Sequence, residues 1–270
     1  MLITESFEMY SSSVGDRFLI QVALPVSYSG GDQSYPLVYS LDAHTMFGTA
    51  SEAAWLMTRD LIRPGYPEVL LVGIGYPDPL MGSLLRVRDL TPVGSVPPYF
   101  EKTYIEQYGV AAKSGGADNY IRFIQEELNP VISERYRTSG DTAGVMGASF
   151  GGLFTFYAFL KQVKLFDRFW MGSPGVFDIG EQYLDDLPKL LERGIERDTR
   201  VYLSQGAVEE TAEFEPYRLL SKSYHRIVET FDQHRQDSLT VKAERFDDET
   251  HTSVLGLAIT RALRFLYPRS

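Results

Sequence analysis

The sequence predicts an α/β fold in which a mostly parallel sheet carries helices on both faces. From about residue 35 onward, short β-rich runs alternate with longer segments of helical periodicity, the pattern of repeated β-α-β units. The first two β-rich runs, 6–10 and 17–24, have no helical segment between them. Parallel neighbours need a long crossover, so we expect this N-terminal edge of the sheet to be antiparallel.

The remaining elements follow without an internal repeat, and we expect one domain spanning residues 1–270. Further strands are predicted at 35–41, 68–76, 142–146, 168–171, 200–204 and 239–246. Helices are predicted at 49–62, 118–136, 152–160, 181–193, 215–234 and 253–266. Pro130 should kink or divide the second of these helices, because proline lacks the amide that a helix interior needs.

Residues 77–116 form a long connection with many prolines and little periodicity. Such a connection is usually functional or mobile. It also holds four aromatic residues, Tyr99, Phe100, Tyr104 and Tyr108, which need somewhere to pack. Two interpretations stay open: a lid or substrate-binding insertion over a pocket, or a folded surface insertion with its own small cluster.

Composition excludes several classes of protein. The formal net charge is −10 and no Lys/Arg cluster is visible, so phosphate backbones repel the chain and nucleic acid is not an expected partner. There are no cysteines, which removes disulfides, thiolate metal sites and a cysteine nucleophile. We expect no membrane partner and a cytoplasmic location, because neither a signal peptide nor an apolar run of membrane-spanning length is visible.

The segment 147–151, Gly-Ala-Ser-Phe-Gly, places Ser149 in a Gly-x-Ser-x-Gly pattern. A β-rich run precedes it and an apolar helical run follows it. This strand–turn–helix context is typical of the nucleophile elbow, where flanking glycines let two backbones approach closely. Ser149 is therefore the predicted nucleophile, and an inert serine in a glycine-rich turn is the alternative.

Four histidines compete for the role of general base: His44, His225, His234 and His251. Two of them, His225 and His234, fall in a charged helical segment. In chains with this kind of elbow the base comes last, on a loop after the final strand. His251 is the histidine that follows the last predicted strand, and we predict it as the base.

The third catalytic member, an acid, should follow the strand that precedes the strand of the base, because it orients the imidazole. That strand is predicted at 200–204, so the candidates are Glu209 and Glu210, with Glu209 favoured. Asp247 and Asp248 are rivals that lie very close to His251 in the sequence. For the oxyanion hole we predict the backbone amides of Phe150 and of His44, the latter after an earlier strand.

Several segments resemble the esterase group of α/β-hydrolases that includes enterochelin and related siderophore esterases, S-formylglutathione hydrolase and the mycolyltransferases. The likeness spans nearly the whole chain, in the expected order. It is carried by Tyr39-Ser40-Leu41-Asp42, by 86–92 (Arg-Val-Arg-Asp-Leu-Thr-Pro), by 147–154, by Ser173-Pro174, by Gly206-Ala207-Val208-Glu209, and by His251-Thr252-Ser253-Val254.

This resemblance implies the α/β-hydrolase fold and ester hydrolysis through an acyl-enzyme, with no metal and no cofactor. The chain departs from the siderophore-esterase pattern at Ala43, where glycine is expected, and after Pro174, where Gly175-Val176-Phe177 replaces a serine and a tryptophan. We therefore expect a serine carboxylesterase acting on simpler carboxylic esters. The alternatives are a siderophore trilactone esterase, an acyltransferase, or a non-catalytic binding protein.

Four residues are candidates for contacts with the ester substrate: Arg88, Tyr99, Phe100 and Phe177. The three aromatic residues would line an acyl or alcohol pocket. Arg88 would bind a carboxylate or carbonyl of the substrate. A salt bridge with the adjacent Asp89 is an equal alternative for this arginine.

Overall fold

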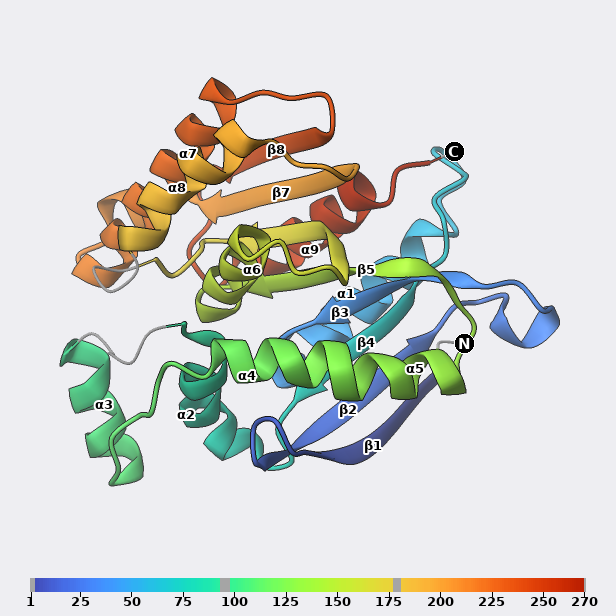
Figure 1. Cartoon of the computed structure of the whole chain (residues 1–270), viewed down its shortest axis with the longest axis horizontal. Coiled ribbons are helices and arrows are strands. Elements are labelled where there is room, and N and C mark those ends of the chain that lie inside the picture. The colour runs from blue at the N-terminus through green and yellow to red at the C-terminus, as the bar shows by residue number, and fades with distance from the viewer. Residues whose placement is uncertain (1–2, 93–97, 177–180, 270) are drawn as a thin grey trace.

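The computed structural model describes residues 3–92, 98–176 and 181–269. In this part of the chain eight strands form one sheet, in the order β1-β2-β4-β3-β5-β6-β7-β8 (Figure 1). The strands are β1 (Ile3–Ser11), β2 (Asp16–Leu24), β3 (Tyr35–Ser40), β4 (Leu70–Gly75), β5 (Thr138–Ala148), β6 (Phe166–Gly172), β7 (Thr199–Gly206) and β8 (Leu239–Phe246).

The pairing confirms the predicted sheet. Strand β2 is antiparallel to both β1 and β4, and every pair from β4 to β8 is parallel. The order reverses at β3, which lies between β4 and β5. In open α/β sheets, ligands bind outside the carboxyl ends of the strands near such a reversal, so the site is expected at that edge.

Helices cover both faces of the sheet. They are α1 (Ala43–Met57), α2 (Pro79–Leu90), α3 (Pro98–Tyr108), α4 (Ala117–Arg122), α5 (Asn129–Arg135), α6 (Phe150–Leu160), α7 (Glu181–Arg193), α8 (Glu215–Gln233) and α9 (Val254–Leu266). Apolar side chains of α1 and α9 pack on one face, and those of α2, α4, α6, α7 and α8 pack on the other (Figure 1). None of the helices in the described ranges combines the length and apolarity that crossing a membrane requires.

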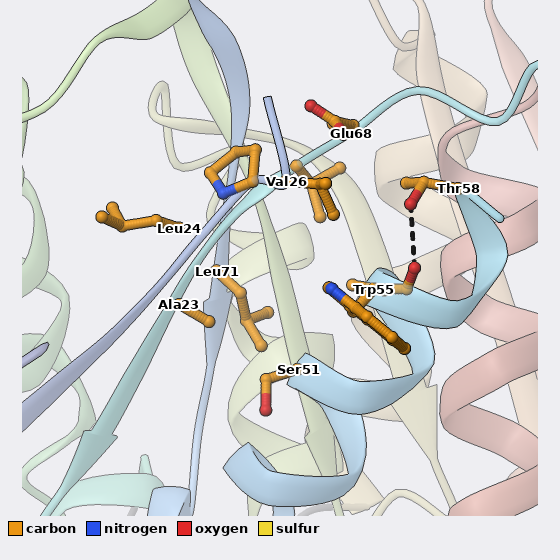
Figure 2. Close-up of a pocket in the computed structure, with 11 residues that line it drawn as sticks. Ala23, Leu24, Val26, Ser51, Trp55, Thr58, Glu68 and Leu71 are labelled. Atoms are coloured by element: carbon orange, nitrogen blue, oxygen red, sulfur yellow. Dashed lines mark hydrogen bonds between the residues drawn. The ribbon is translucent and has the colours of Figure 1, made fainter. Parts of the chain in front are cut away.

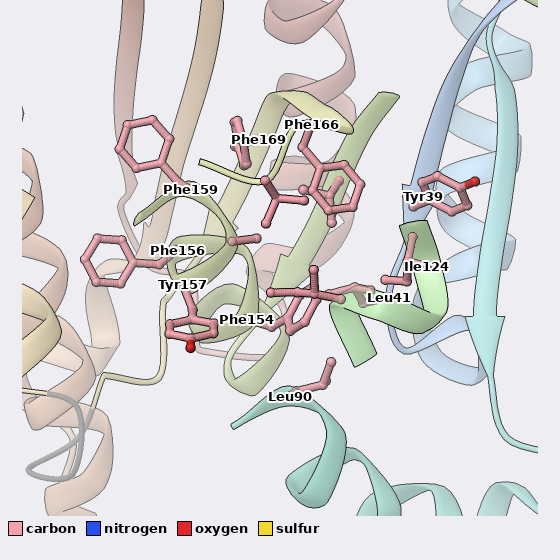
Figure 3. Close-up of a cluster of buried hydrophobic side chains, with 14 of the residues drawn as sticks. Tyr39, Leu41, Leu90, Ile124, Phe154, Phe156, Tyr157, Phe159, Phe166 and Phe169 are labelled. Atoms are coloured by element: carbon pink, nitrogen blue, oxygen red, sulfur yellow. The ribbon is translucent and has the colours of Figure 1, made fainter. Parts of the chain in front are cut away.

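Helix α6 is buried on almost every side, because it lies between the sheet and the neighbouring helices. Its sequence is accordingly apolar all round rather than striped. Figure 3 shows Phe154, Phe156 and Phe159 of this helix among other core side chains, with Phe166 and Phe169 of β6 nearby. Phe159 meets the ring of Phe169 edge to face at 5.4 Å. This packing fixes the helix that follows Ser149.

Residues 77–116 differ from the prediction of a connection with little regular structure, because they contain α2 and α3. Helix α2 begins at Pro79, where the missing amide costs nothing, and the carboxylate of Asp78 accepts a hydrogen bond from Leu80 N at 2.9 Å. Helices α2 and α3 thus each begin with a proline, a residue that interrupts a helix when it lies in the interior. The expected helix at 49–62 is also misplaced: α1 begins at Ala43, directly after β3.

The expected effect of Pro130 takes a specific form. Hydrogen bonding changes from α-helical to π-helical over Phe123–Leu128, and Pro130 then lies in the first turn of α5. A π-helical turn shifts amide partners by one residue, which accommodates a residue without an amide. The helical segment is thereby divided, not ended.

Candidate active site

Ser149 occupies a strained turn between β5 and α6. Its backbone angles are φ 59° and ψ −120°, a region that L-residues rarely adopt. Such strain at a strand-to-helix turn exposes the serine hydroxyl above the sheet. A Cβ on Gly147 would lie 2.4 Å from the carbonyl oxygen of Gly151, so only glycine permits the close approach that this turn requires.

The turn after β6 holds the Ser149 backbone in place. The amide of Ser149 donates to the Gly172 carbonyl at 2.8 Å, and the amide of Gly175 donates to the Ser149 carbonyl at 2.9 Å. A Cβ on Gly152 would meet the Gly172 oxygen at 2.5 Å. The segment 172–175 therefore packs directly against the elbow.

Glu209 faces His251 across the loops that follow β7 and β8. The Oε1 atom of Glu209 lies 3.4 Å from Nδ1 of His251, and the glutamate is 1% exposed. Within the described residues His251 Nδ1 has no hydrogen-bond partner. Catalytic hydrogen bonds are often this long without substrate and shorten when substrate binds.

Close backbone contact holds these two loops together. The amide of Val208 donates to the Glu249 carbonyl at 3.1 Å. A Cβ on Gly206 would lie 2.4 Å from the Glu249 oxygen and 2.6 Å from the Thr250 oxygen. The spacing of Glu209 and His251 therefore depends on glycine at position 206.

The other three candidate acids are placed differently. Glu210 accepts two hydrogen bonds from Arg245, at 2.7 and 3.0 Å, and lies 3.1 Å from Nε2 of His225. The hydrogen bonds from Arg245 hold the pKa of the Glu210 carboxyl below its usual range. Asp247 also pairs with Arg245, and Asp248 occupies a left-handed backbone position. Of the four, Glu209 is the one within ion-pair distance of His251 in the described structure.

The two predicted oxyanion amides lie in the first turns of helices. Phe150 begins α6, and His44 is the second residue of α1. First-turn amides point out of the N-terminal end of their helix, the direction from which a substrate oxygen would approach. These first turns lie close together, because the carboxylate of Asp42 is 3.1 Å from where a Cβ of Gly151 would stand.

A buried ion pair joins these two turns. Arg86 of α2 donates two hydrogen bonds to Asp42, at 2.7 and 2.8 Å. Its guanidinium also lies over the Phe150 ring, 5.2 Å from the centroid. The sequence pointed to Arg86 and Asp42 only as parts of a resemblance, and the structure gives them a contact with the elbow.

Aromatic rings in successive contact connect Phe150, the residue after Ser149, with His251. We call these rings the aromatic rim. In order, they are Phe150, Phe100, Tyr99, Phe214, Tyr217 and His251. The centroids of neighbouring rings in this order are 5.6, 5.6, 4.4, 5.3 and 4.8 Å apart. Two predicted substrate contacts, Tyr99 and Phe100, thus lie on this rim. Phe214 and Tyr217 belong to no sequence motif, and only their tertiary contacts identify them as members of the aromatic rim.

The remaining predicted contacts have other outcomes. Arg88 donates to Asp89 at 2.7 Å and to Asp16 at 2.8 Å, so the salt bridge that the sequence left open is present. Burial raises the pKa of Asp89 despite this partner. Phe177 lies outside the described residues.

A separate small pocket lies at the other end of α1 (Figure 2). Its lining includes Trp55, near the end of the helix, and Leu71, at the start of β4, whereas His44 and Gly75 mark the opposite ends of these elements. The pocket is therefore remote from Ser149, and it takes no part in the site.

An α/β sheet of this topology, with a serine on a strained elbow at its carboxyl edge, defines a serine hydrolase. Residues 85–238, more than half of the chain, match the esterase family described as "Putative esterase". The chain belongs to this family and is an esterase that acts on ester bonds.

Several related proteins are named as siderophore esterases. The chain is 29% identical over 240 residues to the ferri-bacillibactin esterase BesA of Bacillus subtilis, covering 87% of this chain and 80% of the relative. It is 30% identical over 171 residues to the siderophore triacetylfusarinine C esterase of Aspergillus fumigatus, covering 60% and 53%.

Solved structures of related proteins also superpose on nearly the whole of this chain. The BES protein from Bacillus cereus superposes with a TM-score of 0.83 at 25% identity, covering 98% of this chain and 96% of the other. The siderophore hydrolase EstB from Aspergillus nidulans superposes with a TM-score of 0.75 at 25% identity, covering 98% and 95%. These similarities confirm the resemblance inferred from the sequence.

Proposed function

We propose that the chain hydrolyses the ester bonds of a siderophore of the trilactone type, using Ser149 as nucleophile, His251 as base and Glu209 as the orienting acid. The observation that carries this proposal is the pairing of a buried Glu209 with His251, at the same sheet edge as the Ser149 elbow. The named relatives favour the siderophore alternative over the simple carboxylic ester that the sequence analysis preferred.

The mechanism follows from the placement of these groups. The Ser149 oxygen attacks the ester carbonyl carbon while His251 takes its proton, and the amides of Phe150 and His44 hold the resulting oxyanion. His251 then protonates the leaving alkoxide as the ester C–O bond breaks, which leaves an acyl-serine. Water, deprotonated by His251, attacks this acyl group. The bond between the acyl carbon and the Ser149 oxygen then breaks, His251 returns the proton to that oxygen, and the carboxylic acid leaves.

The aromatic rim would contact the substrate beside Ser149. Tyr99 is half exposed, and the rings of Phe100 and Phe214 on either side of it keep it in place. Flat aryl groups of a siderophore would stack on such rings. In this view α2 and α3 form the substrate-binding insertion anticipated for residues 77–116.

The test compares a trilactone siderophore with p-nitrophenyl acetate and butyrate, using wild type and Ser149→Ala. We expect wild type to turn over the trilactone with the highest kcat/KM and Ser149→Ala to lose about a thousandfold or more. Strong turnover of the simple esters without the trilactone would reject the siderophore substrate. Equal rates for the two proteins would reject Ser149 as the nucleophile.

A further inference from the structure

Ser173 combines a strained backbone with a buried hydroxyl. It directly follows β6 at φ 35°, a left-handed conformation that glycine adopts freely and serine does not. The residue is 3% exposed, so it does not face solvent. A strained non-glycine residue persists only where surrounding contacts hold it, and the hydroxyl group of Ser173 makes one such contact.

The partner of that hydroxyl is the carboxylate of Glu209. Ser173 Oγ donates to Glu209 Oε1 at 2.7 Å, and the amide of Gly206 donates to the same oxygen at 3.2 Å. This oxygen is also the one that faces Nδ1 of His251. The other oxygen, Oε2, is buried and has no hydrogen-bond partner among the described residues. The orientation of the carboxylate therefore depends on donors to a single atom.

The turn that carries Ser173 also holds the nucleophile. Its neighbours Gly172 and Gly175 make the two backbone hydrogen bonds to Ser149, and its own amide donates to Ser204 of β7 at 2.7 Å. One short segment, 172–175, thus touches the elbow on one side and the acid on the other. A shift of Ser173 would change the spacing of both.

We infer that Ser173 is a positioning residue whose hydroxyl holds Glu209 in register with His251, and that the 172–175 turn sets the geometry between nucleophile and acid. The inference rests on the proposed triad. Ser173 acts through Glu209 and makes no contact with the substrate. Its loss should lower kcat and leave KM nearly unchanged.

The test replaces Ser173 with glycine, which removes the hydroxyl and relieves the backbone strain together. A merely structural serine and a positioning serine then give different results. With p-nitrophenyl acetate we expect kcat to fall about tenfold, as for one net hydrogen bond lost from a buried network. Tm should change little, because relief of the backbone strain offsets the lost hydrogen bond. The acid limb of the pH–kcat profile should move to lower pH, because a misplaced Glu209 stabilises the imidazolium less.

Ser204→Ala is the matched control. Ser204 is also buried, and its hydroxyl accepts a hydrogen bond from Trp170 Nε1 at 2.9 Å without touching Glu209. Its replacement should lower Tm, because a buried indole N–H loses its partner, and should leave kcat within about twofold. Ser173→Gly should therefore change activity more than stability, and Ser204→Ala should change stability more than activity.

Three outcomes would overturn the inference. Unchanged kcat in Ser173→Gly with a lower Tm would make the serine structural. A move of the acid limb to higher pH would show that the hydroxyl competes with His251 for Oε1. If Ser149→Ala keeps wild-type activity on the same ester, the triad itself is rejected, and the role of Ser173 with it.

Discussion

The two sides of the site are built in different ways. On the side of β5 to β8, Ser149, Glu209 and His251 are held by backbone contacts so close that a Cβ at Gly147 or Gly206 would overlap a carbonyl oxygen. On the side of α3 and the start of α8, the site is lined by aromatic rings that are partly exposed. If the proposed function holds, backbone packing fixes the chemistry, whereas substrate choice depends on side chains that are easily replaced.

The largest effect is expected on the side of β5 to β8, where the adjacent residues Glu209 and Glu210 should respond very differently to the same substitution. Glu209→Gln should lower kcat by about a thousandfold or more, because an amide neither favours the correct tautomer of His251 nor stabilises its charged form. Glu210→Gln should lower kcat by less than about threefold, since Arg245 and His225 are its partners. The measurement is steady-state kinetics of both variants on one ester. Similar losses of kcat in the two variants would contradict the assignment of Glu209 as the orienting acid.

Gly206 gives the next largest effect. Gly206→Ala should push the 249–250 backbone away from β7, lowering Tm by about 5 °C or more and reducing kcat with it. Gly256→Ala is the control: it lies in α9, close to His251 in sequence, and its Cβ would meet no atom within 4 Å. This control should raise the stability by about 0.5–1 kcal/mol, because alanine is the better helix former. Thermal melts that rank the two variants in the reverse order would refute the packing argument.

A smaller effect is expected on the substrate side. Tyr99→Ala should raise KM for aryl esters by about twofold to tenfold, the size of one aromatic contact, and should hardly change KM for an acetate ester. Tyr10→Ala is matched to it: Tyr10 is 56% exposed and Tyr99 is 52% exposed, but Tyr10 lies on β1, the edge strand far from β5. Equal KM values for wild type, Tyr99→Ala and Tyr10→Ala would show that the aromatic rim does not contribute to substrate binding.

The fold was predictable because its signals are local. Strand β4 is buried at every position and reads as a continuous apolar run, as a central strand must. The antiparallel edge followed from the missing helix between the first two strands. Helices α2 and α3 were not predicted, because proline at a first helical position reads the same in sequence as proline that ends a helix.

The sequence indicates the candidate site less completely than the fold. A local motif indicates Ser149 and chain order indicates His251, but neither separates Glu209 from Glu210, which are neighbours in sequence. In the structure, the two glutamates differ because Arg245, 35 residues away, pairs with Glu210. The contact of Tyr217 with His251 is likewise tertiary, and an aromatic residue on a helix face carries no signal for it.

The last prediction concerns the charge of the substrate. Residues 206–218 hold four glutamates and one arginine, and three consecutive acids, 247–249, directly precede Thr250 and His251. Arg245 pairs with Glu210 and Asp247 and offsets one of these charges, which leaves the two segments net negative. A ferric catecholate complex is an anion, whereas the phenols of the iron-free ligand are protonated near neutral pH. If a catecholate trilactone is the substrate, we expect kcat/KM at low salt to be about twofold to tenfold higher for the iron-free form, because the acidic segments repel the complex.

Two experiments, a change of ionic strength and the variant Glu213→Gln, separate this electrostatic effect from a difference in how well the two substrate forms fit the site. Added salt screens exposed charges, so the preference for the iron-free form should shrink between about 0.02 and 0.5 M NaCl. Glu213→Gln removes an exposed charge next to Phe214 of the aromatic rim and should raise kcat/KM for the ferric complex alone. A preference for the iron-free form that ignores both salt and Glu213 would instead reflect the shape of the complex. A preference for the ferric form would mean that the substrate side recognises the metal-bound shape strongly enough to overcome the repulsion.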